Sequence, residues 1–174
     1  IWFAFPVNAP GVEMGLRKPT TTATDAFSYP LSTRFDEYES AVILRDVFVS
    51  WDRVFAYRNV NTCLYLTRAM GWLLLSHLAR MLARYEFSLG LGLAVTSSLK
   101  TSKIPGVTEV LTDLAIQTET LRTALAASVG EAGESPAGNL LPDLTHLAVG
   151  TLHGLSTEAA VANTVRTLSG QGVM

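Results

Sequence analysis

The sequence predicts a mainly α-helical protein with a small β part at its start. Residues 41–49 are rich in β-branched and aromatic side chains, a composition typical of a strand on a half-buried sheet. From residue 61 onward, apolar residues instead recur at the spacing of amphipathic helices. Between these parts, Trp51, Val54 and Phe55 provide apolar anchors separated by charged residues. We therefore expect the joint between the two parts there, with Trp51 buried in it.

Within the β part we expect three strands. The first covers residues 1–7, the second covers Val12–Leu16, and the third is the stretch 41–49. A Thr-rich loop at 18–28 follows the second strand, and its hydroxyl groups can form local backbone bonds that compete with regular structure. Three strands with this spacing cannot close a barrel, so we expect open sheet edges in this part.

The helical part is expected to hold four segments. They are residues 61–98, a helix from Pro105 to a loop at 130–139, residues 143–152, and residues 157–168. Asn61 or Thr62 can cap the first of them. Gly154 is expected to interrupt the chain between the third and the fourth, and Ser169 and Gly170 are expected to stop the last one.

The composition argues against several classes of function. A formal net charge of −2 argues against binding nucleic acid through its phosphates. The single cysteine, Cys63, excludes an internal disulfide and a cysteine-only metal site, and it suits a reducing cytoplasm. The low charged fraction of 16% indicates surface that is buried against something else. No basic segment followed by an apolar stretch and a cleavage site marks a signal peptide after Ile1.

The segment 71–95 is apolar enough to raise the question of a membrane span. His77, Arg80, Arg84 and Glu86 interrupt it, so no uncharged run reaches the roughly 18 residues that a bilayer crossing needs. A helix that is apolar around most of its circumference is usually buried among other helices. We therefore expect this helix inside a bundle and expect no membrane partner.

Three motifs in the first third of the chain resemble those of one known family. The run DVFVSWDRVF at residues 46–55 resembles the DDVLVPWERVF signature of the 4-hydroxyphenylacetate 3-monooxygenase family, a family of FAD-using aromatic hydroxylases. YPLSTRFDE at 29–37 and FAFPVNAPGV at 3–12 are similar to that family's HPLSSRxDE and FAxPxxxPGx, with the same order and spacing. The departures from the pattern are Ser50 in place of Pro, Tyr29 in place of His, and Gln171 inside a glycine run.

The resemblance implies the fold class in more detail. Residues 1–56 would be the end of an acyl-CoA dehydrogenase-like middle β-domain, and residues 57–174 a C-terminal antiparallel helical bundle, incomplete at its end. The implied protein is a homotetrameric oxygenase that hydroxylates a phenol such as 4-hydroxyphenylacetate, ortho to its hydroxyl. Reduced FAD would come from a separate flavin reductase and react with O2. The family's catalytic residues lie mainly upstream of Ile1, so we expect a piece of a longer protein that contains none of them.

One cofactor-binding element is implied by the same resemblance. In acyl-CoA dehydrogenase-like folds, a turn after a late helix approaches the flavin of a neighbouring subunit. Here that turn comprises Ser169, Gly170, Gln171 and Gly172. Backbone N–H groups in a glycine-broken turn can cradle phosphate. A plain stop of the last helix explains the same glycines, and both interpretations stay open.

Two groups of basic side chains are further candidates. His77, Arg80 and Arg84 share one helical stripe, which could meet an anionic group or a neighbouring subunit, or could be a solvated helix face. His146 and His153 are two helical turns apart. Because zinc needs three or four ligands, we interpret these two as surface histidines and expect no metal.

The longest helix is expected to pack against copies of itself in a symmetric oligomer. Its apolar residues cover more of its circumference than one neighbouring helix can bury. Small residues would allow close approach, and these are Gly71, Ala79, Ala83 and Gly90. Leu82 and Leu89 are expected in the interface, beside Arg80 and Arg84. No strand precedes Gly90 and Gly92, so we interpret them as packing positions and not as a dinucleotide-binding loop.

Two other functions remain open from the sequence. One is another enzyme of the same fold, a dehydrogenase or a 4-hydroxybutyryl-CoA dehydratase-like protein. The dehydratase needs an iron–sulfur cluster with several ligands, which Cys63 alone cannot supply. The other is a non-catalytic helical module for oligomerisation.

Overall fold

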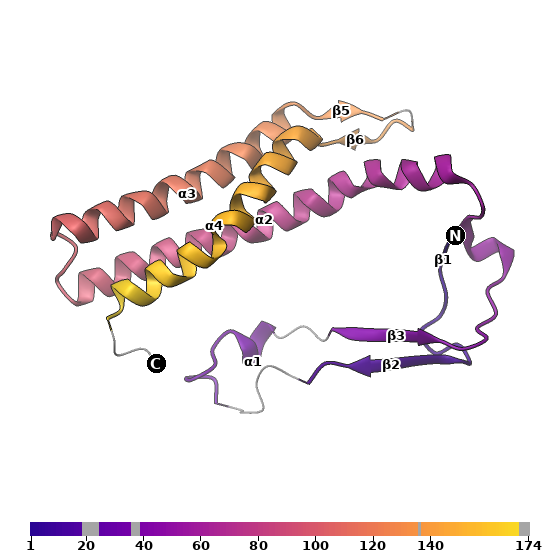
Figure 1. The fold of residues 1–174 in the computed structure, drawn as a ribbon, viewed down its shortest axis with the longest axis horizontal. Coiled ribbons are helices and arrows are strands. Elements are labelled where there is room, and N and C mark those ends of the chain that lie inside the picture. The colour runs from indigo at the N-terminus through magenta and orange to yellow at the C-terminus, as the bar shows by residue number, and fades with distance from the viewer. Residues whose placement is uncertain (19–24, 36–38, 136, 171–174) are drawn as a thin grey trace. The chain divides into compact units, whose positions relative to one another are not determined.

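The computed structural model describes residues 1–18, 25–35, 39–135 and 137–170 (Figure 1). The chain forms two compact units, Ile1–Cys63 and the part from Leu64 onward. The first unit contains short strands and turns, and the second is built from long helices. The expectation of a mainly α-helical protein with a small β part is confirmed.

The first unit holds two separate pairs of antiparallel strands. β2 (Val12–Leu16) pairs with β3 (Ser40–Leu44), and β1 (Trp2–Phe3) pairs with β4 (Val54–Ala56). A single-turn helix, α1 (Ser32–Phe35), lies between β2 and β3 in the sequence. Among the described residues of this unit there is no continuous sheet, so the expected open strand edges are present.

The strand Val12–Leu16 is confirmed, whereas the other two predicted strands are shorter than expected. The first narrows from residues 1–7 to Trp2–Phe3, and the third ends at Leu44 instead of residue 49. It ends there because the chain turns into the left-handed region at Asp46, where φ is 50°. β4 was not predicted, since three residues are too few to show a period.

Trp51 was expected to be buried, and this expectation is wrong for the chain. Its side chain is 72% exposed. Trp51 begins a 3-10 turn, and its ring meets the ring of Tyr57 edge to face at a centroid distance of 5.3 Å. Among the described residues of this unit, Ala56 is the only buried one, so the unit has no core that could cover an indole.

Three helices make up most of the second unit. They are α2 (Val60–Ser98), whose first turn belongs to the first unit, α3 (Pro105–Gly130) and α4 (Leu144–Leu168). Between α3 and α4, β5 (Gly133–Glu134) pairs with β6 (Leu140–Leu141) in a small hairpin, which begins in the predicted loop 130–139 and ends just beyond it (Figure 1).

The helix starts follow capping chemistry, with one difference from the prediction. Asn59, and not Asn61 or Thr62, accepts the N–H of Thr62 at 3.1 Å, so α2 is capped one position before its first residue. Pro105 opens α3 as expected. Asp143 caps α4 by accepting the N–H of His146 at 2.9 Å.

The predicted break at Gly154 does not occur, because α4 is one continuous helix. Two glycines one turn apart, Gly150 and Gly154, lie buried where α4 crosses its neighbours. A methyl group added at Gly150 would lie 2.7 Å from Ala124 Cβ and 2.9 Å from Leu78 Cδ2. Here glycine therefore permits close helix packing, and tertiary contacts outweigh its low helix propensity.

The direction of the helices follows from their contacts. A side chain at Gly71 would meet Leu144, and one at Gly92 would meet Leu168, so α2 and α4 run in parallel. α3 runs antiparallel to both, consistent with the expected antiparallel bundle (Figure 1). All three helices supply the buried cluster, which comprises Leu78, Met81, Leu82, Tyr85, Leu114, Leu121, Leu147 and Val161.

The expectation that Leu82 lies in an interface between subunits is wrong, because Leu82 is buried in the core of its own chain. Leu89 is partly buried against that core. Gly92 is confirmed as a packing position, since a side chain there would lie 3.3 Å from Leu111 and Leu168. Gly90 has no neighbour within 4 Å of an added Cβ. No helix in the described ranges has the length and apolar character needed to cross a membrane.

Candidate functional site

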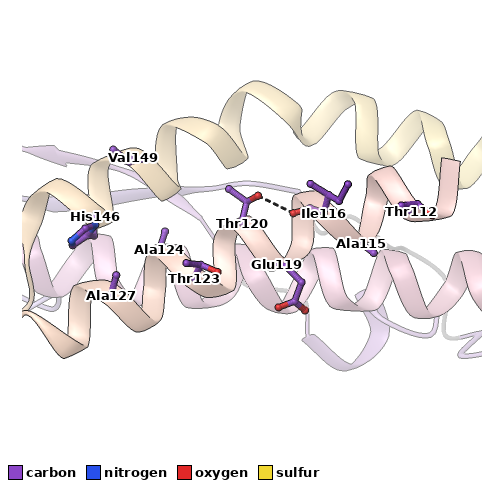
Figure 2. Close-up of a pocket in the computed structure, with 10 residues that line it drawn as sticks. All are labelled: Thr112, Ala115, Ile116, Glu119, Thr120, Thr123, Ala124, Ala127, His146 and Val149. Atoms are coloured by element: carbon purple, nitrogen blue, oxygen red, sulfur yellow. Dashed lines mark hydrogen bonds between the residues drawn. The ribbon is translucent and has the colours of Figure 1, made fainter. Parts of the chain in front are cut away.

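One candidate site in the helical unit is a groove between α3 and α4, with a volume of about 650 Å³ (Figure 2). One face of α3 forms most of its wall, and two residues of α4 complete it. Its lining residues are mostly small or apolar, and they are Thr112, Ala115, Ile116, Glu119, Thr120, Thr123, Ala124, Ala127, His146 and Val149. Its size and surface suit apolar groups.

Most polar groups of this groove have hydrogen-bond or ion-pair partners within the chain. His146 Nε2 lies 3.1 Å from a carboxylate oxygen of Glu131, and Glu119 accepts from Arg122 Nε at 3.1 Å. The hydroxyl of Thr120 donates to the carbonyl of Ile116 at 2.8 Å (Figure 2). These bonds join positions within α3 or at the ends of α3 and α4, so the fold alone explains them.

The two histidines of α4 lie on one unbroken helix but have separate partners. His146 pairs with Glu131, whereas His153 Nε2 lies 2.5 Å from Gln117 Oε1 on α3. Within the described residues, no three His, Cys, Asp or Glu side chains come together in a way that could hold a metal ion. His153 therefore links α4 to α3, and His146 links α4 to Glu131, the residue that directly follows α3.

The three basic residues of the α2 stripe, His77, Arg80 and Arg84, have different surroundings in the structure. Arg84 forms an ion pair with Glu158 of α4, so this residue joins two helices. Arg80 is exposed and forms no ion pair with the described residues. Glu86, which follows the stripe in the sequence, pairs with Arg122 of α3 at 2.8 Å. His77 is half-buried.

The turn after α4 was expected to approach a flavin. Gly170 has a φ of 73°, which favours glycine, and it follows Ser169 at the helix end. The N–H of Ser169 donates to Val165 O at 3.1 Å, and that of Gly170 donates to Thr167 O at 3.2 Å. Both N–H groups thus close the helix and form no anion cradle here. Gln171 and Gly172 lie outside the described residues.

The buried polar centre of the helical unit is Tyr85, which the sequence-based reasoning did not single out. Its hydroxyl donates to Gly154 O at 2.7 Å and lies 2.8 Å from Thr157 Oγ1, so it joins α2 to α4. Its spacing from Leu78, Met81 and Leu82 would have placed it on the core face. Its polar partners lie about seventy residues away in sequence, where no local pattern indicates them.

Tyr85 also gives the bundle a pH dependence. Burial raises the pKa of Tyr85 above its ordinary value, and the hydrogen bond with Thr157 offsets part of this rise. The native state therefore favours the protonated phenol, so the stabilisation is complete below about pH 10 and falls as pH rises through the native pKa. We expect the free energy of unfolding to fall more steeply above about pH 10 in this chain than in Tyr85→Phe. Urea titrations across this range measure both slopes, and equal slopes would contradict the expectation.

Comparison with known families gives two matches that together span nearly the whole chain. Residues 1–56 match the family model described as 4-hydroxyphenylacetate 3-hydroxylase N terminal. Residues 60–174 match the model described as 4-hydroxyphenylacetate 3-hydroxylase C terminal.

Solved structures show the same fold. The oxygenase component of 4-hydroxyphenylacetate 3-monooxygenase superposes with a TM-score of 0.91 at 26% identity, over 99% of this chain and 37% of that one. Its complex with FAD and 4-hydroxyphenylacetate gives a TM-score of 0.82 at 27% identity, over 95% of this chain and 35% of that one. An archaeal 4-hydroxybutyryl-CoA dehydratase from N. maritimus shares the fold at 16% identity, with a TM-score of 0.84 over 97% of this chain and 34% of that one. The fold is that of the acyl-CoA dehydrogenase-like proteins.

The chain belongs to the 4-hydroxyphenylacetate 3-hydroxylase family, as its three N-terminal motifs indicated. The FADH(2)-dependent monooxygenase TftD of Burkholderia cepacia is 28% identical over 98% of this chain and 33% of the relative. The oxygenase component of a 4-nitrophenol 4-monooxygenase/4-nitrocatechol 2-monooxygenase from Rhodococcus opacus is 30% identical over 100% of this chain and 33% of the relative. The chain thus spans about a third of the length of these relatives.

Proposed function

We propose that this chain forms the C-terminal part of the oxygenase component of a two-component flavin monooxygenase. The reaction is hydroxylation of a phenol, ortho to its hydroxyl, with reduced FAD and O2. The observation that carries the proposal is the ordered match of the N-terminal and C-terminal family models to residues 1–56 and 60–174. We place the domain boundary at the same point, with the β-domain in residues 1–56 and the helical domain in 57–174.

A phenolic substrate is favoured by what the relatives act on and bind. One is named for 4-nitrophenol and 4-nitrocatechol, and one solved structure is a complex with 4-hydroxyphenylacetate. All three compounds are phenols. Two of the relatives are called oxygenase components, which favours a separate reductase as the source of reduced FAD. We place this system in the cytoplasm, which the single cysteine suits.

The last turn of the chain is our candidate for a contribution to the flavin site. We propose that Ser169, Gly170, Gln171 and Gly172 approach the flavin of a neighbouring subunit. In the chain itself, the N–H groups of Ser169 and Gly170 are used to close α4. Contact of this turn with a flavin would therefore use groups other than these two N–H groups.

The first test uses the chain alone. We expect the purified 174-residue polypeptide to bind no stoichiometric FAD and to form no catechol from 4-hydroxyphenylacetate when a flavin reductase supplies reduced FAD. The reason is that the chain spans only about a third of the length of its relatives, so most of the residues that form their active site are outside it. Flavin absorbance and chromatography of the products measure both. A yellow, stoichiometric complex would show that the chain carries a flavin site of its own.

The second test asks whether the chain supports hydroxylation within a complete oxygenase. Residues 1–174 would replace the matching third of the Rhodococcus opacus relative, with the native relative as control. The proposal expects hydroxylation of 4-nitrophenol in the presence of a reductase. A chimera that folds and binds FAD like the control but never hydroxylates any of several phenols would refute the proposal.

We also propose that the protein assembles as a homotetramer through the outer face of α2. This outer face comprises Trp72, Leu73, Ala79, Arg80, Ala83, Phe87 and Gly90. Its residues are exposed in the chain, and it lies opposite the α2 residues that form the core. The small residues allow a second helix to approach closely, while Trp72 and Phe87 provide apolar contact area.

Charges placed on the outer face should dissociate the assembly without unfolding the subunit. We expect the double variant Trp72→Asp/Phe87→Asp of the complete oxygenase to lose its tetramer, because carboxylates would be buried without partners. Sedimentation equilibrium measures the mass. The matched control is Val129→Asp, an equally exposed apolar residue at the end of α3. If the double variant keeps the mass of the control, the outer face of α2 is not the interface.

A further inference from the structure

Thr151 has a buried hydroxyl without a partner. This α4 residue is only 7% exposed, and its Oγ1 atom forms no hydrogen bond. A buried hydroxyl without a hydrogen bond is costly, and most such groups in proteins are paired. The position therefore calls for a partner that lies close to α4.

Other helical threonines show why the hydroxyl of Thr151 differs. Most of them use the carbonyl four residues back in their own helix. This is the case for Thr96, Thr112, Thr118, Thr120, Thr157 and Thr167, at 2.8–2.9 Å. Thr151 makes no such bond with Leu147, although the carbonyl of Leu147 stands at the same spacing. Its hydroxyl is thus free to bond across to another helix.

The register between α2 and α4 identifies the residue opposite Thr151. The two helices stay in contact from Gly71 and Leu144 to Gly92 and Leu168, so they run together through this region. Arg84 pairs with Glu158, at a sequence separation of 74. Two helical turns earlier on each helix, the same separation joins His77 to Thr151.

We propose that His77 is the hydrogen-bond partner of Thr151. The imidazole is half-buried, it has one nitrogen that accepts and one that donates in the neutral form, and rotation of its side chain can turn either nitrogen toward α4. His77–Thr151 and Arg84–Glu158 are then two successive polar contacts along one line between α2 and α4. These contacts fix how far one helix is shifted along the other.

This pairing gives different roles to the members of the basic stripe. His77 and Arg84 then both contact α4 inside the chain. Arg80 belongs to the outer face of α2 and is exposed in the single chain. The three residues of the stripe therefore do not form a single binding surface.

A double-mutant cycle in this chain tests the pairing. Thr151→Val removes the hydroxyl and keeps the shape, and His77→Leu removes the imidazole. We expect Thr151→Val alone to raise the unfolding equilibrium constant about fivefold in urea titrations. In the His77→Leu background, the hydroxyl of Thr151 has already lost its partner. Thr151→Val should then leave the unfolding equilibrium constant unchanged or lower it. Thr151→Ser, which keeps a hydroxyl, is the matched control.

The nitrogen chemical shifts of His77 provide a second measurement that packing alone would not change. We expect Thr151→Val to change the balance between the two neutral tautomers of His77, and Thr151→Ser to leave it closer to that of the parent chain. Two results would overturn the pairing. One is an effect of Thr151→Val that is the same with and without His77, and the other is a stabilising effect of Thr151→Val in the parent chain.

Discussion

Gly150→Val should destabilise the helical unit by about 3 kcal/mol or more. A Cβ atom at this position would lie 2.7 Å from Ala124 Cβ and 2.9 Å from Leu78 Cδ2. The alanine side chain has no torsion that could move its Cβ away, so α3 and α4 would have to separate. The gain in helix propensity over glycine is less than about 1 kcal/mol and cannot offset this loss. Urea titration followed by circular dichroism measures the effect.

Gly90→Ala is the matched control for this substitution. It also replaces a helical glycine, but an added Cβ at Gly90 meets no atom within 4 Å. We expect the isolated chain to gain stability, by up to about 1 kcal/mol, from the higher helix propensity of alanine. If both variants changed stability by the same amount, the close approach at Gly150 would not be the reason for its glycine.

Leu121→Ala should lower the free energy of unfolding by about 2–5 kcal/mol, which is the second large effect that we expect. Leu121 is completely buried in the cluster that all three helices share, so its removal leaves a cavity with few ways to close. Ile116→Ala on the same helix is the control, because Ile116 is 56% exposed. We expect this control to cost less than about 1 kcal/mol. A loss at Leu121 no larger than that of the control would place the core elsewhere.

Helix positions could be predicted from the sequence wherever local chemistry determines them. Pro105 and Asp143 mark helix starts through their own backbone and side-chain properties, and both are confirmed. Gly154 misled the prediction because its meaning depends on what lies against it. A glycine that ends one helix and a glycine that permits a crossing look alike until the neighbouring helix is known.

Burial was harder to predict than helix positions. Leu82 was placed in an interface and Trp51 in a core, and both expectations were wrong for this chain. An apolar residue on a helix that is apolar on most sides can face its own chain or another, and periodicity alone does not distinguish these. The candidate groove and the bonds of Tyr85 could not be predicted either, since they join helices that are distant in sequence.

The parallel contact between α2 and α4 has a consequence for the order of folding. The bond between Arg84 and Glu158 closes a loop of 74 residues, whereas the β5–β6 hairpin holds the end of α3 near the start of α4. The entropy cost of closing a loop grows with its length, so we expect α3 and α4 to associate before α4 reaches α2. Contacts made late are absent from the transition state, so weakening them speeds unfolding more than it slows folding. We therefore expect substitutions at Arg84 or Glu158 to change the unfolding rate of the bundle more than its folding rate.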